Sequence, residues 1–233
     1  MIAIQGWKAM SLSRVITQTL FPCQCACCRN PTDTTGLCPS CLEALPLFSP
    51  AEGNLLLRPD IQAQFNLPDC DGLIACGWYR GALKRWLCDL KLHQRNHAAC
   101  LLRQVITHQW QCYCEEQLIE ADAAIIIPLP KHRLVNRGFN QVMQTWGRVL
   151  ETQLSILPVL SKRITRAQQS LNRRARLHNQ RQAFTLSETL AGRRILLVDD
   201  VITTGATLNA AAQLCRHAGA EQIWACATCL TPA

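Results

Sequence analysis

The fold class follows from one stretch of the chain, Arg194-Ile-Leu-Leu-Val-Asp-Asp-Val-Ile-Thr-Thr-Gly-Ala-Thr-Leu208. Ile195 to Val198 are consecutive aliphatic residues, too few for a helix, and they predict a parallel strand that is buried on both faces. Asp199 and Asp200 follow at its carboxyl end, and a helix is expected to begin near Leu208. A strand, a loop and a helix in this order predict an α/β fold in which helices flank a parallel sheet.

The loop of this stretch, Thr203-Thr-Gly-Ala-Thr207, suits an anionic ligand. Gly205 lets the backbone approach a ligand, and the hydroxyls can cap the helix that follows. Backbone N–H groups at a helix N-terminus attract phosphate, while carboxylates at a strand tip accept hydrogen bonds from vicinal hydroxyls or hold a hydrated Mg²⁺. A sugar phosphate would satisfy both halves of the stretch.

Two other protein classes also place acidic residues after an aliphatic run. In response-regulator receivers the phosphoacceptor aspartate comes several dozen residues after the acidic pair, but no Asp follows Asp200 here. A Walker B strand requires a phosphate loop of the form G-x-x-x-x-G-K-[ST], and the chain contains none. Both alternatives are therefore excluded.

Length and composition predict one medium α/β domain with a small appendage, because the chain has 233 residues and is 48% hydrophobic. Lys8 and Arg14 interrupt any apolar run in the first twenty residues, so we expect no signal peptide and no spanning helix there. A short amphipathic helix is expected over 10–20. These features predict a cytoplasmic protein, which partners could hold at the inner face of the membrane, and mostly reduced cysteines.

Two cysteine pairs near the N-terminus have the spacing of a metal site. Cys25-x-x-Cys28 and Cys38-x-x-Cys41 offer four thiolates, which suit tetrahedral Zn²⁺. Four sulfur ligands leave no position open for water, so the predicted role of the zinc is structural. Cys23 and Cys27 lie in the same cluster, and either could replace a neighbour as a ligand.

The remaining patterns divide the chain into an N-terminal helix and knuckle over 1–48, a linker over 49–71 and an α/β domain over 72–233. Prolines and small polar residues place the linker, since little periodicity survives there. Within the α/β domain, strands are expected at 72–79, 121–130 and 221–230, and helices at 80–92, 98–118 and 140–154.

Polar residues at two loops of the α/β domain could face an anion. Lys91 ends the helix predicted over 80–92, and Arg137 and Asn140 follow the strand predicted over 121–130. In open α/β sheets, ligands collect at the carboxyl ends of the parallel strands. These residues therefore predict a second part of the same ligand site.

Nearly all of the chain's net charge of +8 lies in one segment without acidic residues, between Thr152 and Ser187. Such a segment favours a polyanion, either a phosphorylated small molecule or nucleic acid. It has few apolar residues and lies between two predicted strands, so we expect a loop with a short helix that could close as a lid. Its cations are Lys162, Arg163, Arg166, Arg173, Arg174, Arg176 and Arg181.

Four stretches give the chain a resemblance to the ComF/GntX family of competence-associated, phosphoribosyltransferase-like proteins. They are the four-cysteine knuckle, the segment from Tyr79-x-Gly81 to Lys91, the run Arg137-Gly-Phe-Asn-Gln141, and Val198-Asp-Asp-Val-Ile-Thr-Thr-Gly-Ala-Thr207. The last is shared with all type I phosphoribosyltransferases, whereas Arg-Gly-Phe-Asn-Gln is specific to this family. Arg166, Gln169, Arg176 and Asn179 also look like that family.

The resemblance implies the type I phosphoribosyltransferase fold and a site for phosphoribosyl pyrophosphate (PRPP) with Mg²⁺. Asp199 and Asp200 would hold the ribose hydroxyls and act in catalysis, and Lys91, Arg137 and Asn140 would bind the pyrophosphate. The lid would comprise the cations of the basic segment and Gln169. The PRPP-binding set implied for this chain is Asp199, Asp200, Val201, Thr203, Thr204, Gly205, Ala206 and Thr207.

Three functions are compatible with these features. The first is a PRPP-binding protein that supports the uptake or use of single-stranded DNA. The second is a metabolic phosphoribosyltransferase acting on a nucleobase or an amine. The third is a non-catalytic PRPP sensor whose zinc knuckle recruits a DNA-transport ATPase or helicase.

Overall fold

The computed structural model describes residues 23–32, 35–162 and 184–232, and the chain divides into two compact units, 1–45 and 46–233. The helix predicted over 10–20 lies outside the described residues. No helix in the described ranges combines the length and the apolar character needed to cross a membrane.

The N-terminal unit is built from short elements that bring its cysteines together. Strands β1 (Cys23–Gln24) and β2 (Pro31–Thr32) pair antiparallel, and helix α2 (Pro39–Glu43) follows. The backbone N–H of Arg29 donates to the carbonyl of Cys25 over 2.9 Å and closes the turn between the first two cysteines of the cluster. Pro39 begins α2 at a position where a helix needs no N–H donor.

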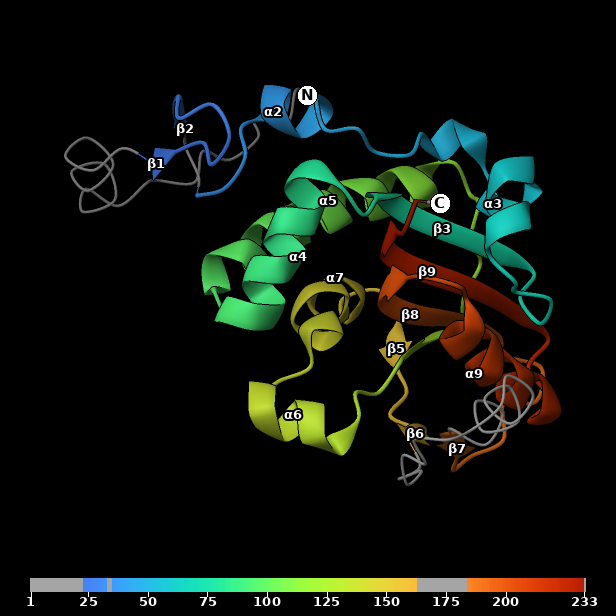
Figure 1. Cartoon of the computed structure of the whole chain (residues 1–233). Helices are drawn as coiled ribbons and strands as arrows, with labels where there is room; N and C mark the ends of the chain where they lie inside the picture. Colours follow the sequence, from blue (N-terminus) through green and yellow to red (C-terminus); the bar gives the residue numbers. More distant parts are fainter. Residues whose placement is uncertain (1–22, 33–34, 163–183, 233) are drawn as a thin grey trace, which may run out of the picture. The chain divides into compact units, whose positions relative to one another are not determined.

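The second unit contains the parallel sheet that the sequence predicts (Figure 1). In the described part of the chain this sheet has five strands in the order β3-β9-β8-β4-β5. All neighbouring strands are parallel, as in other α/β folds. The strands are β3 (Gly72–Trp78), β4 (Ala123–Ile126), β5 (Ser155–Ile156), β8 (Arg194–Ile202) and β9 (Gln222–Leu230).

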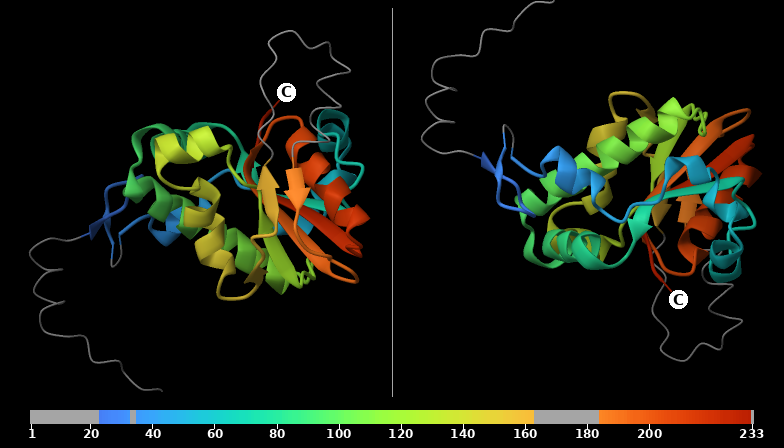
Figure 2. Two further views of the ribbon diagram at one scale, coloured as in Figure 1. Left: turned by 90° about the horizontal axis from the view of Figure 1, so that it is seen from below. Right: turned by 90° about the horizontal axis from the view of Figure 1, so that it is seen from above.

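Helices cover both faces of this sheet (Figures 1 and 2). One face carries α4 (Gly81–His93), α5 (Asn96–Glu115), the π-helix η3 (Met143–Gly147) and α7 (Arg148–Leu150). The other face carries α3 (Pro59–Gln64) and α9 (Ala206–His217). Buried polar groups tie the first layer to the sheet: the Tyr113 hydroxyl donates to the Ala75 carbonyl over 2.9 Å, and the Trp146 indole donates to the Thr228 hydroxyl over 2.9 Å.

The segment 49–71, which the sequence predicts as a linker, has regular structure. It forms the 3₁₀ helices η1 (Pro50–Glu52) and η2 (Leu55–Leu57), then α3. Leu55 and Ile61 are fully buried in the core of the second unit. The prolines begin short helices here rather than interrupting structure, and elements of three to six residues are too short to give a periodic pattern.

Three further elements differ from the sequence-based expectations. Strand β8 continues through both aspartates to Ile202, because β9 pairs with it as far as Leu230. The predicted helix over 140–154 is largely a π-helix followed by one turn of α-helix, and a separate helix α6 (Lys131–Arg137) precedes it. Strands β6 (Leu160–Lys162) and β7 (Phe184–Leu186) form an antiparallel pair that the sequence analysis did not predict.

Candidate functional site

A pocket of about 420 Å³ lies at the carboxyl end of the parallel sheet, where β8 presents its two aspartates. Strands β3, β4 and β8 end here, so the loops that follow them supply most of the walls. The lining residues are Tyr79, Lys91, Ile127, Pro128, Leu129, Pro130, Arg133, Arg137, Gln141, Lys162, Asp199, Asp200, Val201, Thr203, Thr207 and Thr231.

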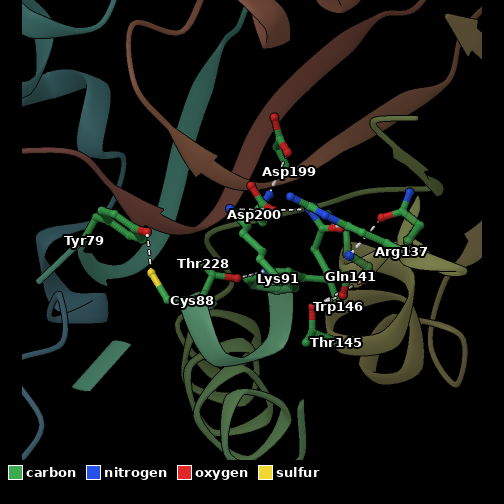
Figure 3. A network of polar contacts seen from close by, with 12 residues as sticks. Tyr79, Cys88, Lys91, Arg137, Gln141, Thr145, Trp146, Asp199, Asp200 and Thr228 are labelled. Atoms are coloured by element: carbon green, nitrogen blue, oxygen red, sulfur yellow. Dashed lines mark hydrogen bonds and ion pairs between the residues drawn. The ribbon is translucent and has the colours of Figure 1, made fainter. Parts of the chain in front are cut away.

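Asp200 lies at the centre of a polar network at the base of this pocket (Figure 3). Its carboxylate is buried, and Oδ2 lies 2.9 Å from the ammonium Nζ of Lys91 at the end of α4. The side-chain amide of Gln141 donates a hydrogen bond to the same oxygen. The buried negative charge is thus paired and hydrogen-bonded, as a charge at this depth requires.

Gln141 connects Asp200 to a second cation. The guanidinium Nη1 of Arg137 donates to Gln141 Oε1 over 3.1 Å, and Gln141 is itself buried. Arg137 is among the residues that the sequence predicts for this site, whereas Gln141 is not. Gln141 lies in the same run as Arg137, Arg137-Gly-Phe-Asn-Gln141, and that run is the signal that could have found it.

Asp199 is half-buried beside Asp200, and its Oδ1 accepts a hydrogen bond of 2.7 Å from the backbone N–H of Asp200. Burial of the side chain, and then the neighbouring charge of Asp200, raise the pKa of Asp199 to about 7. Two carboxylates so close together favour a cation or hydrogen-bond donors from a ligand, because either would relieve their repulsion.

The loop after β8 encloses a small cavity of about 30 Å³, lined by residues from Asp199 to Leu208. Gly205 is the N-cap of α9 and has a φ of 81°, in the left-handed region that favours glycine. A Cβ atom at this position would lie 3.0 Å from Leu67 Cδ2. The expected hydroxyl cap is absent from α9: Gly205 takes the N-cap position, and the hydroxyl of Thr204 instead accepts a 3.4 Å hydrogen bond from the N–H of Ala206 within the loop.

Cations outnumber carboxylates among the pocket-lining residues. The pocket is lined by four cations, Lys91, Arg133, Arg137 and Lys162, and by two carboxylates, Asp199 and Asp200, so the charge balance favours an anionic ligand. Lys162 is the one predicted lid residue within the described ranges.

The Lys162 ammonium lies 5.4 Å from the centroid of the Phe184 ring, and burial lowers its pKa. The other predicted lid residues lie outside the described residues: Arg163, Arg166, Gln169, Arg173, Arg174, Arg176 and Arg181.

Asn140 does not line this pocket, although the sequence analysis assigns it to the anion site. Its Oδ1 accepts a hydrogen bond of 2.9 Å from the N–H of Val142, and its Nδ2 donates to the Ile127 carbonyl over 3.4 Å. The side chain therefore fixes the start of the helical segment against the end of β4, and it faces a neighbouring, more apolar groove of about 580 Å³.

The four predicted zinc ligands form a cluster in the N-terminal unit. The sulfur atoms of Cys25, Cys28, Cys38 and Cys41 all lie within 4.8 Å of one another, and Cys28 Sγ is 3.8 Å from Cys38 Sγ. Tetrahedral zinc with Zn–S bonds of about 2.3 Å places its sulfurs about 3.8 Å apart. The cluster therefore fits structural Zn²⁺.

Electrostatics within the cluster also favour a bound dication. The backbone N–H of Cys38 donates to Cys25 Sγ over 3.3 Å, and such hydrogen bonds lower the pKa of the Cys25 thiol to about 6. The pKa of Cys41 is raised to about 12, first because its thiol hydrogen-bonds to Cys38. The sulfurs cannot all ionise at this spacing without a positive charge among them, which zinc would supply.

Comparisons with known proteins give one domain family and several relatives. Residues 148–233 match the phosphoribosyl transferase domain family. The chain is 32% identical over 208 residues to the DNA utilization protein YhgH of Escherichia coli K12, covering 86% of this chain and 88% of that protein. It is 29% identical over 211 residues to competence protein F of Haemophilus influenzae, covering 85% and 86%. With competence protein ComFC of Streptococcus pneumoniae it shares 41% identity over 99 residues, covering 42% and 44%.

Proposed function

The chain belongs to the ComF family of phosphoribosyltransferase-like proteins, and we propose that it binds PRPP with Mg²⁺ and serves the use of single-stranded DNA. One observation carries the PRPP half: two carboxylates near the end of β8 adjoin a tight loop at a helix N-terminus, and cations line the same pocket as the carboxylates. A ribose that bears a 5′-phosphate and a diphosphate offers complementary groups to each of these parts.

The proposed roles follow from the chemistry of each part of the pocket. Asp199 and Asp200 accept hydrogen bonds from the ribose hydroxyls. The segment 201–207, which joins β8 to α9, binds the 5′-phosphate through backbone N–H groups and hydroxyls at the start of α9. The diphosphate is bound by Lys91 and Arg137, together with Arg133 and Lys162. Asn140 supports the loop beside Arg137 but does not contact the diphosphate.

The residues of the pocket are also suited to Mg²⁺. Carboxylate oxygens are the donors that this ion prefers. Burial, and then the charge of Asp200, raise the pKa of Asp199, and a cation bound beside the two carboxylates would favour its ionised form. Asp199 and Asp200 would hold the ion, directly or through water. When bound, Mg²⁺ would neutralise charge on the diphosphate as it leaves.

If the site transfers the phosphoribosyl group, a nucleophile forms a bond to C1 of the ribose as the bond from C1 to the diphosphate breaks. Asp199 and Asp200 would stabilise positive charge on the sugar, and Lys91 and Arg137 the negative charge on the departing diphosphate. The acceptor is tested by measuring PRPP consumption with and without single-stranded DNA, and then with a panel of nucleobases and amines.

Calorimetric titration with PRPP and Mg²⁺ tests the binding site. We expect the wild-type protein to bind and the double variant Asp199→Ala/Asp200→Ala to give no heat of binding. Asp122→Ala is a matched control, since Asp122 pairs with Arg194 at the opposite end of β8. Unchanged heats in the double variant would refute the assignment of the site.

The DNA half of the proposal rests on the names of the relatives and on the basic segment that includes Arg173, Arg174 and Arg176. Each phosphate contact by a cation releases counterions, so affinity for single-stranded DNA should fall with increasing salt. Replacing these three arginines by glutamine should weaken binding and reduce the salt dependence. Binding that is absent, or that does not depend on salt, would remove this half.

We further propose that the N-terminal unit contacts a DNA-transport ATPase or helicase. A closed four-thiolate site has no open position for a substrate, so the N-terminal unit is not suited to catalysis at the metal. Its surface is instead available to bind a protein partner. Capture of such an ATPase by the immobilised protein should survive Asp199→Ala/Asp200→Ala and be lost in Cys38→Ser/Cys41→Ser. The opposite pattern would contradict the proposal.

A further inference from the structure

Gln141 lies between a group that can only donate hydrogen bonds and a group that only accepts them. Its Oε1 accepts from the Arg137 guanidinium over 3.1 Å, and its Nε2 donates to Asp200 Oδ2. Because an arginine has no acceptor and an ionised carboxylate has no donor, these partners fix which way round the amide lies. The side chain is 3% exposed, so water cannot replace either partner easily.

Lys91 and Gln141 both contact Asp200, but their side chains differ in how firmly they are held. The Lys91 ammonium reaches Asp200 from the end of a long flexible side chain that is 19% exposed. A ligand phosphate could therefore draw it away. Gln141, by contrast, is held at the amide by Arg137 and at the backbone by the Thr145 hydroxyl, which donates to the Gln141 carbonyl over 2.8 Å.

We propose that Gln141 is a positioning residue that fixes the Asp200 carboxylate for its ligand and links that carboxylate to the cation of Arg137. This inference rests on the proposed PRPP and Mg²⁺ site. It identifies the group that holds the Asp200 carboxylate in place when a ligand phosphate draws Lys91 away from it. An anion bound at Arg137 and a ligand bound at Asp200 are then coupled, since both act on one amide. The assignment concerns geometry: Gln141 acts through Asp200.

Other side chains of similar size would fail at this position for different reasons. Glutamate would pair with Arg137, but when ionised it could not donate to Asp200 and would repel it. Leucine would fill the space and leave the Asp200 oxygen without this donor. Glutamate, unlike leucine, regains a donor when it takes up a proton, which gives the two substitutions distinct pH profiles.

The test measures the affinity for PRPP with Mg²⁺ from pH 6 to pH 8.5 in Gln141→Leu and Gln141→Glu, each divided by the wild-type value at the same pH. We expect Gln141→Leu to lose about tenfold to a hundredfold at every pH, as for a hydrogen bond to a charged group. Gln141→Glu should lose more than this at pH 8.5 and recover as the pH falls. Gln153→Glu is a matched control, because Gln153 accepts from the Trp110 indole away from the pocket.

Folding is checked separately by circular dichroism, and the double variant Arg137→Met/Gln141→Leu completes a cycle with the single variants. The loss in the double variant should be smaller than the sum of the single losses, since both break one chain of hydrogen bonds. If a Gln141 variant does not fold, Arg137→Met is compared with wild type instead, because it breaks the same chain of hydrogen bonds. The quantity compared is then the affinity for Mn²⁺ alone, measured by electron paramagnetic resonance.

The possible failures are distinguishable. Additive losses, or a Gln141→Glu deficit that does not change with pH, would overturn the positioning role while wild-type binding of PRPP stands. A wild-type protein that does not bind PRPP would refute the proposed function instead. In that case the Mn²⁺ titration still decides whether Gln141 controls the cation affinity of Asp200.

Discussion

Replacing Asp199 by asparagine should stabilise the protein and at the same time weaken its binding of PRPP. The pKa of Asp199 is raised from its ordinary value of 3.8 to about 7, first by burial and then by the charge of Asp200. The folded protein therefore keeps a proton that the unfolded chain has lost, and the free energy of unfolding decreases as the pH rises from about 4 to about 7. Asparagine removes this penalty and keeps an oxygen for the N–H of Asp200.

The size of the effect follows from the shift. About 3 pKa units correspond to about 4 kcal/mol when the group is fully ionised in the folded state. Asp199 is half-buried, so solvent screens part of the repulsion and we expect about 2–3 kcal/mol at pH 8. At pH 5 the wild-type carboxyl is protonated in the folded state, and most of the advantage of the variant should disappear.

Urea denaturation of both proteins at pH 5 and pH 8, followed by tryptophan fluorescence, measures this difference. The zinc cluster is common to both proteins, so its own pH dependence cancels in the comparison. Calorimetry on the same samples should show PRPP affinity lowered at least tenfold. An advantage of Asp199→Asn that is equal at both pH values, or a variant less stable than wild type at pH 8, would refute the reasoning.

Three further substitutions test other parts of the structure. Lys91→Met should raise the affinity for Mn²⁺ alone about tenfold, because the substitution removes a cation that competes for Asp200. The same substitution should lower the affinity for PRPP by a similar factor. Calorimetry that shows both affinities changing in the same direction would contradict this prediction. Cys38→Ser should reduce the zinc content measured by mass spectrometry to under about 0.1 per chain, and retention of zinc would exclude Cys38 as a ligand. Gly205→Ala should cost about 1–3 kcal/mol in urea denaturation, since alanine at a φ of 81° would also press on Leu67; an unchanged midpoint would show that the loop adapts freely.

Local patterns were sufficient to predict the parts of the site that are adjacent in sequence. An aliphatic run followed by Asp199 and Asp200 predicts a strand and its carboxyl end from a few residues, and two Cys-x-x-Cys pairs predict the sulfur cluster. In each case the backbone between the functional residues is too short to permit many alternatives. The parallel α/β sheet flanked by helices is confirmed for a similar reason, since β4 and the first half of β8 are largely buried aliphatic runs.

Features that depend on contacts between distant segments were not predictable in this way. Gln141 meets Asp200 across 59 positions, because α6 and the π-helix bring the chain back over the end of β8. The segment 49–71 looks like a linker because its elements are short, yet Asp69 and Asn209 exchange hydrogen bonds of 3.0 and 2.9 Å across 140 positions. The periodicity of apolar residues along the sequence does not reveal such contacts, because the packing of the whole unit determines them.

The order of the strands has a consequence for biosynthesis. Strand β9, at residues 222–230, lies between β3 and β8, so the sheet is divided until this segment has left the ribosome. Until then β3 and β8 each have an open edge of unpaired backbone N–H and C=O groups, and such edges aggregate in nascent chains. A stop codon in place of Gln222 should therefore abolish folding of the second unit, and chaperone demand during translation should be highest just before β9 emerges.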